Sequence, residues 1–479
     1  MDILGNLNID AAFVALVTCL VAAFYFKSKK SESQQHVKGP VAVPLIGTIY
    51  SHGFAITEQQ LTAYAKQYGN MFSLQFGPRH CIVVSGHELI NDVISRPDDF
   101  GQKGLYEEYV WGLINPSQKG IISLDHGDEY RRTCDKIKAA FGPIGDVILS
   151  EQVSAEMSTL CNEMRSSVEK RLNPREQIDS FVMNVLLRGL VGTSLALEST
   201  EMTKLKQSTG DFHSMFAATS VIDCVPLVHY VPSMKRRLLN FVYSFLNTKA
   251  FMESQVSNAL ENEHAALGNC FLQNYLNNPA KSMRRVRLID TDELIHLLTD
   301  LLIEQTHVRQ LVWKLLEYLA QDRDIQEKLF KDIQAISSTH DGDDVITHLP
   351  YLQAVTAEAA RLFDKPLMTF QKSNPKDVVK LGNMTIAKGT RLILNNDSVN
   401  SGADAWKDPR VFKPERFLNK NGQFKGCGKM LSFQLDSATL PWHSTTWIQL
   451  CLMVFHLIRS FKFEENNETT ESIFTIKIR

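Results

Sequence analysis

The feature that most constrains the fold is a long stretch, from about residue 142 to residue 362, in which apolar residues recur at helical spacing and prolines are few. Strand-like segments with turn residues beside them lie outside this stretch, at 71–76, 81–85, 378–381, 390–394 and 474–478. The first two of these are separated by Gly77-Pro78 and are expected to pair as a hairpin. A last amphipathic helix is expected at 443–460. The expected fold class is therefore mainly α (α+β), a large helical body with a small, discontinuous β-sheet.

An uncharged apolar run occupies residues 11–26, and three lysines follow it within four residues. Sixteen helical residues span about 24 Å, close to the roughly 30 Å of a hydrocarbon core. Because the positive charge follows the run, we expect an uncleaved signal anchor that leaves the body of the chain in the cytosol. An ordinary buried helix is the alternative interpretation. The expected organisation is a short lumenal N-terminus (1–10), a transmembrane signal anchor (11–26), a polar linker (27–38) and one large domain (39–479).

Charge and cysteine content exclude several classes of protein. The formal net charge is −2, which gives no reason to expect a nucleic-acid partner. The eight cysteines form no C-x-x-C pair and no regular spacing, so we expect neither a zinc site nor a disulfide framework.

Several motifs follow one another in the second half of the chain. Residues 358–361 read E-A-A-R, residues 387–390 read A-K-G-T, and residues 406–417 read W-K-D-P-R-V-F-K-P-E-R-F. Together with the apolar N-terminal run and a Pro/Gly segment at 39–47, this series resembles the microsomal members of the cytochrome P450 superfamily over nearly the whole chain. The resemblance implies a P450-like domain, anchored by one helix in the endoplasmic reticulum membrane with its body facing the cytosol.

Three charged residues carry the structural part of the resemblance. Glu358 and Arg361 lie three positions apart, so they share one face of a helix. In the family this pair joins the arginine of the P-E-R-F segment, here Arg416, in a buried triad behind the haem. The resemblance thus implies a structural role for these three residues, and it does not by itself imply activity.

The segment that should bind haem iron departs from the family. The family motif F-x-x-G-x-R-x-C-x-G supplies a cysteine thiolate to the iron. Starting from Phe433, its first glycine, arginine, cysteine and last glycine fall on Asp436, Ala438, Leu440 and Trp442. A leucine at the axial-ligand position has no lone pair to offer, so no metal site is expected there.

Three other residues could in principle bind the iron in place of a cysteine at position 440. Cys427 lies upstream between two glycines, Cys451 lies inside an apolar helical segment, and His443 follows the loop. None of them lies within the family motif, and each is more simply an ordinary residue of a turn or a helix.

Contacts with the haem propionates are also altered. The family's W-x-x-x-R segment falls on Tyr130 and Cys134, and another arginine position falls on Gln371. With Ala438, three cations are replaced by neutral side chains. Each charge-assisted hydrogen bond is worth roughly 1.5–3 kcal/mol, so their loss together weakens haem binding by several orders of magnitude.

The helix that activates oxygen in the family shows the same trend. The family's A-G-x-[DE]-T segment falls on residues 302–306. Ile303 replaces a glycine, and Gln305 replaces an acid that could deliver protons. Thr306 is the only retained oxygen-site residue, and Glu304 could serve as the acid if the alignment shifted by one position.

These observations leave three hypotheses. The first is a pseudoenzyme without haem-thiolate monooxygenase activity, with no cofactor, which binds a hydrophobic small molecule or a protein partner. The second is a haem-dependent oxidoreductase with atypical iron ligation. The third is that the sequence from Leu431 to Trp447 comes from a mis-spliced gene model, and that the true product is an ordinary monooxygenase. The resemblance implies that a basic stretch, Arg131-Arg132 through Lys136 and Lys138, faces the electron-donating reductase, but without haem that interaction is not expected.

Overall fold

The computed structural model describes residues 37–43, 47–48, 51, 56–76, 79–103, 110–124, 127–144, 146–167, 174–210, 212, 231–261, 269–277, 290–337, 346–363, 371–373, 378–402, 405–427, 443–465 and 474–478. The α-helices in the first half are α3 (Glu58–Tyr68), α4 (His87–Ser95), α5 (Pro97–Phe100), α6 (Val110–Ile114), α7 (Asp128–Phe141), α8 (Asp146–Ser167), α9 (Pro174–Val191) and α11 (Pro232–Glu261). Those that follow are α12 (Phe271–Leu276), α14 (Thr291–Gln305), α15 (His307–Gln321), α16 (Arg323–Ser337), α17 (Pro350–Leu362), α18 (Asn396–Asn400) and α20 (His443–Ser460). A 3₁₀ turn, η3, covers Pro414–Phe417.

The strands form three separate sheets. They are β1 (Met71–Phe76), β2 (Arg79–Val84), β3 (Gln102–Lys103), β4 (Gln371–Ser373), β5 (Val378–Leu381), β6 (Met384–Ala387), β7 (Arg391–Leu394), β8 (Phe461–Glu465) and β9 (Phe474–Ile478). The largest sheet has the order β1-β2-β7-β4-β3, while β5 pairs with β6 and β8 with β9. β2 and β7 run parallel with Cys81 opposite Arg391, so segments some 300 residues apart in the chain meet in one sheet.

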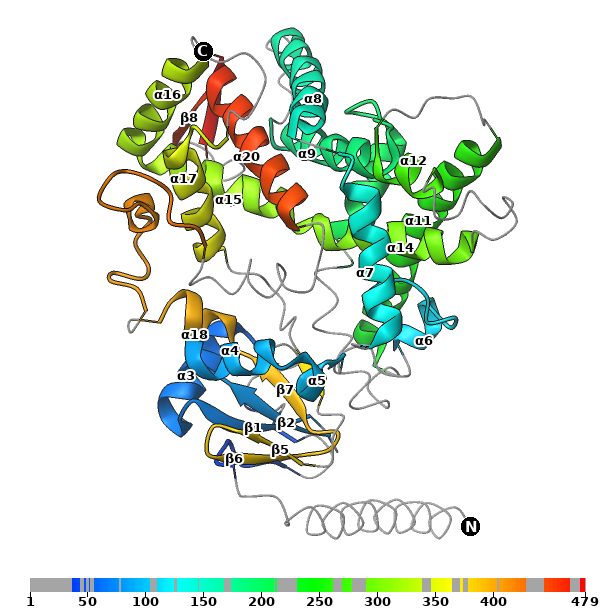
Figure 1. Ribbon diagram of the computed structural model, residues 1–479, viewed down its shortest axis with the longest axis vertical. Coiled ribbons are helices and arrows are strands. Elements are labelled where there is room, and N and C mark those ends of the chain that lie inside the picture. Colours follow the sequence, from blue (N-terminus) through cyan, green and yellow to red (C-terminus); the bar gives the residue numbers. More distant parts are fainter. Residues whose placement is uncertain are drawn as a thin grey trace, which may run out of the picture.

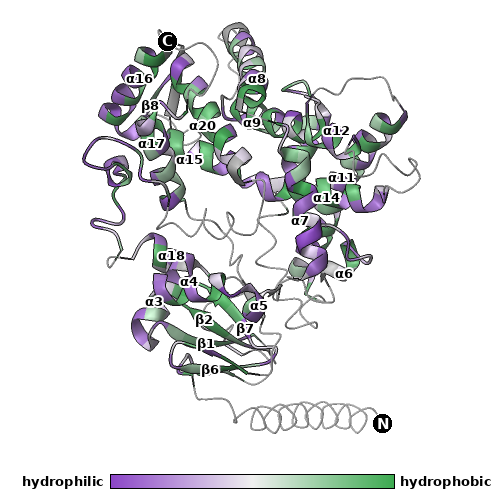
Figure 2. Ribbon diagram, in the orientation of Figure 1, coloured by the Kyte–Doolittle hydropathy of each residue, from purple (hydrophilic) through white to green (hydrophobic). Residues whose placement is uncertain are grey.

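The sheet and the helices occupy different parts of the molecule. Figure 1 shows β1, β2, β5, β6 and β7 at one end with α3, α4 and α18 against them, and the long helices at the other end. Hydrophobic residues colour β2 and β7, whereas α7 carries many hydrophilic residues (Figure 2). Two smaller apolar clusters stabilise the sheet end, and one large cluster fills the helical end.

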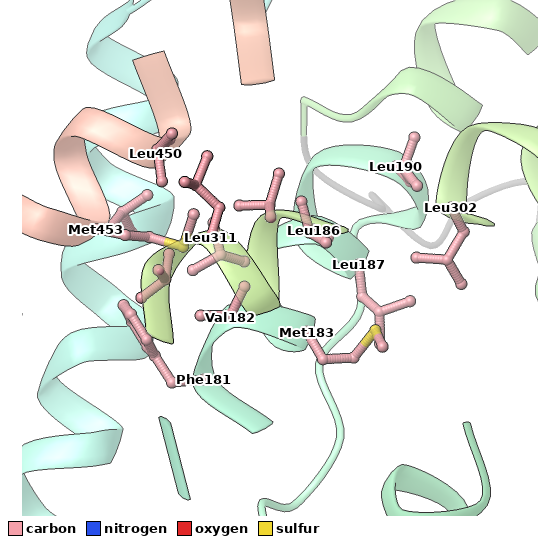
Figure 3. Close-up of a cluster of buried hydrophobic side chains, with 14 of the residues drawn as sticks. Phe181, Val182, Met183, Leu186, Leu187, Leu190, Leu302, Leu311, Leu450 and Met453 are labelled. Atoms are coloured by element: carbon pink, nitrogen blue, oxygen red, sulfur yellow. The ribbon is translucent and has the colours of Figure 1, made fainter. Parts of the chain in front are cut away.

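Helix α9 lies at the centre of the helical part. All of its residues from Phe181 to Leu187 are buried, which is typical of a helix surrounded by other helices. Figure 3 shows Phe181 and Leu186 of α9 in one cluster with Leu302 of α14 and Leu450 of α20. Because α14 and α20 both pack here, this core fixes the two helices that border the candidate site.

The helices that carry site residues begin at identifiable signals. Pro350 occupies the first turn of α17, where its missing N–H costs no intrahelical bond. Asp290 caps α14, since its carboxylate accepts a hydrogen bond from the Glu293 N–H at 3.0 Å. α7 starts with Asp128 and Glu129, whose negative charges favour a helix N-terminus.

Most of the elements expected from the sequence are confirmed. The expected hairpin is formed by β1 and β2, and the expected last helix spans His443–Ser460. The strand expected at 474–478 is β9. The mainly α composition with small separate sheets is also confirmed for the part of the chain that is described. The short strands β3, β4, β6 and β8 were not predicted. The transmembrane segment expected at 11–26 lies outside the described residues, and none of the described helices is long and apolar enough to cross a membrane.

Candidate functional site

A buried, hydrogen-bonded polar cluster of the candidate site joins Glu358, Arg361 and Arg416. Arg361 donates from Nε and Nη2 to the two carboxylate oxygens of Glu358, each at 2.8 Å. Arg416 donates from Nε to Oε1 of Glu358 at 2.9 Å. The side chains of Glu358 and Arg361 are 0% exposed, and that of Arg416 is 9% exposed. One buried carboxylate therefore neutralises part of the charge of two guanidinium groups.

The remaining donors of the two arginines bind backbone carbonyl groups. Arg361 Nη1 donates to the carbonyls of Asn400 and Pro409 at 2.6 and 2.7 Å. Arg416 Nη1 donates to the carbonyl of Lys407 at 2.8 Å. The arginines thereby attach α17 to the irregular segment between α18 and η3. The cluster stabilises this segment, and its donors are occupied by the protein itself.

An aromatic residue that sequence reasoning did not single out supports the same cluster. Trp406 donates from its indole nitrogen to the Val399 carbonyl at 2.8 Å. The guanidinium carbon of Arg361 lies 5.0 Å from the centre of the Trp406 ring, within the range of a cation–π contact. The position of Trp406 at the start of the W-K-D-P segment, ten residues before Arg416, was the signal available in the sequence.

The neutral residues expected at the propionate-binding positions lie on the buried face of α7. Tyr130 and Cys134 are four positions apart and are 5% and 6% exposed. Both belong to the large apolar cluster of the helical part. Their surroundings hold hydrophobic side chains, and neither residue brings the positive charge that a carboxylate-bearing cofactor would need.

The other positions predicted from the family motif are only partly described. Gln371 begins β4, where it lies opposite Ile393 of β7. Ala438, Leu440 and Trp442 lie outside the described residues, in the segment that directly precedes α20. The structure therefore does not place the loop that would carry the axial ligand.

The two cysteines nearest to this loop have protonated thiols. Burial raises the pKa of the Cys427 thiol to about 12 and also raises the pKa of Cys451, which lies inside α20. The thiolate is the form of cysteine that binds metals, so both residues are poor candidates for an iron ligand. Among the described residues, no group of three or more His, Cys, Asp or Glu side chains could hold a metal ion. Among the described residues near this loop, Cys427 and Cys451 therefore supply no thiolate for a haem.

The retained threonine, Thr306, is the single residue between the helices α14 and α15. α14 ends at Gln305 and α15 begins at His307. The Thr306 hydroxyl donates to the Ile303 carbonyl at 2.7 Å, a common local bond of threonine in helices. Ile303 and Gln305 beside it are buried. Here an isoleucine side chain occupies the position at which a glycine would leave open space.

A buried polar pair on α14 was missed by the sequence analysis. Asp300 is completely buried, and its carboxylate accepts a hydrogen bond from the Ile122 N–H at 3.0 Å. His296, one turn earlier, lies with its Nε2 2.8 Å from Lys249 Nζ on α11. Burial, with a smaller contribution from the Lys249 charge, lowers the pKa of His296 to about 4. His296 and Asp300 stand among apolar residues in the middle of α14, and this was the signal available in the sequence.

Two of the four basic residues of α7, Arg131 and Lys136, are engaged in ion pairs. Arg131 lies 3.1 Å from Asp98 and 3.3 Å from Asp128. Lys136 Nζ lies 2.5 Å from the Glu293 carboxylate on α14. These contacts reduce the positive charge that α7 offers to an acidic partner protein.

Comparison with known proteins places the chain in a family. The sequence model described as "Cytochrome P450" matches residues 37–434, and so ends two residues before Asp436. "Cytochrome P450 1A1" of Sparus aurata is 25% identical over 446 residues, covering 88% of this chain and 84% of the relative. "Cytochrome P450 1A1" of Oncorhynchus mykiss is 24% identical over 499 residues, covering 97% and 92%. The protein belongs to the cytochrome P450 family.

Proposed function

We propose that this protein is a membrane-anchored member of the cytochrome P450 family that lacks haem-thiolate monooxygenase activity, and that it is therefore a pseudoenzyme. One observation carries the proposal: the residues that hold the fold together are kept, while those that would hold haem are replaced. Glu358 binds both Arg361 and Arg416 in a buried cluster. By contrast, the axial cysteine position is Leu440, and Ala438 and Cys134 occupy cation positions.

The surroundings of the candidate site support this proposal in two ways. The buried side chain of Ile303 stands where the family has a glycine. The thiols of Cys427 and Cys451 are held in the protonated form by burial, so neither offers a substitute thiolate. A haem would thus lose its iron–thiolate bond and most of the charges that bind its propionates.

The proposed location is the endoplasmic reticulum membrane, with one transmembrane segment at 11–26 and the body of the chain in the cytosol. Support comes from the apolar run at 11–26 and the lysines that follow it, because positively charged residues beside a membrane span are usually kept in the cytosol. We do not expect a functional complex with a reductase, because Arg131 and Lys136 of α7 already pair with acidic residues of the same chain.

The proposed ligand is a hydrophobic small molecule or a protein partner. The buried side chains of Leu302 and Ile303 make α14 apolar in the region where the family holds its cofactor and substrate, which favours an apolar ligand there. Organic extraction of the purified protein followed by mass spectrometry tests the first of these. Recovery of one lipid-like compound in stoichiometric amount would support a small-molecule ligand, and an extract without any would favour a protein partner.

An absorbance spectrum tests the central claim. Full-length protein produced with a supply of haem precursor should show no Soret band and no pyridine haemochrome. A P450 that retains the F-x-x-G-x-R-x-C-x-G motif, prepared in parallel, controls for the haem supply. One haem per chain in the purified protein would overturn the proposal and favour a haem-dependent oxidoreductase with atypical ligation.

A further inference from the structure

Helix α11, the longest of the described helices, exposes an apolar stripe on its outer face. Its inner face is buried and includes Phe241 and Phe245. On the opposite face Leu239 is 43% exposed, Tyr243 is 61% exposed and Leu246 is 44% exposed. These three side chains lie at helical spacing, so they form one continuous strip. A soluble surface normally carries such residues singly, and a contiguous group indicates a contact with another molecule.

The stripe continues into charges of opposite sign at its two ends. Arg236 is exposed one turn before Leu239, and Glu253 is exposed one turn after the small residue Ala250. At 100° per residue, the six residues of this face lie within a sector of about 100° around the helix axis. They are Arg236, Leu239, Tyr243, Leu246, Ala250 and Glu253. Within the described part of the chain, neither Arg236 nor Glu253 is engaged in a hydrogen bond or ion pair. The face is therefore basic at one end, apolar in the middle and acidic at the other end.

We propose that this face binds the same face of a second copy of the chain, with the two α11 helices antiparallel. We place the two-fold axis of the dimer level with the midpoint between Ser244 and Phe245 of α11. A residue before this midpoint in one copy then lies opposite the residue equally far after it in the second copy. Arg236 then meets Glu253 of the second copy, Leu239 meets Ala250 of the second copy, and Tyr243 meets Leu246 of the second copy. Every position on the stripe is matched by a partner that complements it in charge or in size. Such self-complementarity is what an isologous dimer interface requires.

The distribution of charge selects a second copy over other partners. An anionic lipid surface would attract Arg236 and its neighbours Lys235 and Arg237, but it would repel Glu253 on the same face. An acidic or a basic partner protein would meet one favourable and one unfavourable end. An antiparallel copy satisfies both ends at once. The small side chain of Ala250 opposite Leu239 also lets the helix axes approach to about 8–10 Å, the usual packing distance.

The interface is small, so the dimer should depend on concentration. Arg236 and Glu253 are about 26 Å apart along the helix at 1.5 Å per residue. A single pair of helices of this length buries little surface compared with the roughly 1,200–2,000 Å² that stable complexes bury. We therefore expect a reversible monomer–dimer equilibrium rather than a permanent dimer.

Charge exchange provides the test, with sedimentation velocity of the full-length protein in a mild detergent as the measurement. Arg236→Glu and Glu253→Arg should each weaken dimerisation by about tenfold or more, because each places like charges opposite one another. The double variant Arg236→Glu/Glu253→Arg should restore it to within about threefold of the unchanged protein, since the pair is re-formed with reversed sign. Tyr243→Asp should abolish it, and Val411→Asp, at a residue that is 56% exposed but lies far along the chain from α11, should leave it unchanged.

Circular dichroism and thermal unfolding of each variant establish that the fold is retained, which is expected because all substituted side chains are exposed. Protein that stays monomeric at every concentration would overturn the proposal. So would a dimer that none of the α11 variants weakens, or one that the charge exchange fails to restore. Binding of monomers to phosphatidylserine vesicles that is lost in Tyr243→Asp would assign the stripe to a membrane and would equally overturn it. None of these outcomes depends on whether the protein binds haem.

Discussion

Glu358 is the residue on which the arrangement of α17, Arg361 and Arg416 depends, because it is the only acid in that buried cluster among the described residues. Glu358→Gln keeps the shape of the side chain but removes its charge, so two guanidinium groups are left buried without an anion. We expect a loss of about 3–5 kcal/mol in the free energy of unfolding, measured by urea denaturation. Glu415→Gln is the matched control: its exposed pair with Lys328 should contribute at most about 1 kcal/mol. Equal effects of the two substitutions would contradict a central role for Glu358.

His296, which is buried, and His456, which is half-buried, should make the fold sensitive to acid. Burial lowers the pKa of both His296 and His456 to about 4, whereas the pKa of histidine in the unfolded chain is about 6.5. Between these values the unfolded state binds the proton and the folded state does not, so stability falls as the pH falls from 6.5 to 4. Each histidine contributes up to about 1.4 kcal/mol per pH unit in this window.

Urea denaturation at pH 7 and pH 5 measures this dependence. His296→Gln should reduce the loss of stability between the two pH values, and the additional change His456→Gln should reduce it further. His87→Gln, at an exposed position on α4, serves as the control and should leave the loss unchanged. An unaltered pH dependence in the double variant would show that other groups cause the acid sensitivity.

The residues that sequence reasoning identified differ from those it missed in the range of their contacts. Glu358 and Arg361 are three positions apart on one helix, so their contact follows from local geometry. Arg416 was found only through its motif, since it lies 58 positions from Glu358. Asp300 and His296 were missed because their partners, Ile122 and Lys249, come from distant segments that no local pattern connects to α14.

Among the elements, the segment before α7 is fitted closely against α14. Gly120 has a positive φ of +87°, and a Cβ added there would lie 2.3 Å from the carboxylate oxygen of Asp300. Gly120→Ala should therefore combine backbone strain of about 1–2 kcal/mol with a steric cost of about 1–3 kcal/mol. Gly422, with a φ of +75° and open space around it, provides the control, and Gly422→Ala should show only the backbone cost. Thermal unfolding of the two variants measures the difference, and equal values would contradict the close packing of this segment on α14.

The elements that could be predicted are those defined by their own sequence. The hairpin of β1 and β2 and the helix α20 have strong local patterns, and their bounds agree closely with the expected ones. The strands β3 and β4 are two and three residues long, and each exists because a distant strand pairs with it. The break at Thr306 was also not predicted, because the sequence on either side of it continues the helical pattern.

For the molecule as a whole, we expect several substitutions, and not a single one, to prevent haem binding. Leu440→Cys restores the axial cysteine, but Ala438, Cys134 and Gln371 still provide no positive charge for the propionates. At roughly 1.5–3 kcal/mol per missing charge-assisted bond, this variant alone should gain no stable haem. Its Soret absorbance after purification is the measurement, with circular dichroism as the check on folding. Stoichiometric haem in Leu440→Cys would show that the propionate contacts matter little.

The proposed orientation of the chain, with its body in the cytosol, can be tested at a potential glycosylation site on its surface. Asn383-Met384-Thr385 is an acceptor sequence for N-glycosylation, and Asn383 is exposed in the turn between β5 and β6. A body in the cytosol never meets the glycosyl transferase, so the protein made in animal cells should show no change in mobility after treatment with an endoglycosidase. The control is the same chain with residues 1–38 replaced by a cleavable secretory signal, which should be glycosylated in a manner that Asn383→Gln reduces. Glycan on Asn383 of the unaltered chain would place the body in the lumen and would remove the basis for a cytosolic role.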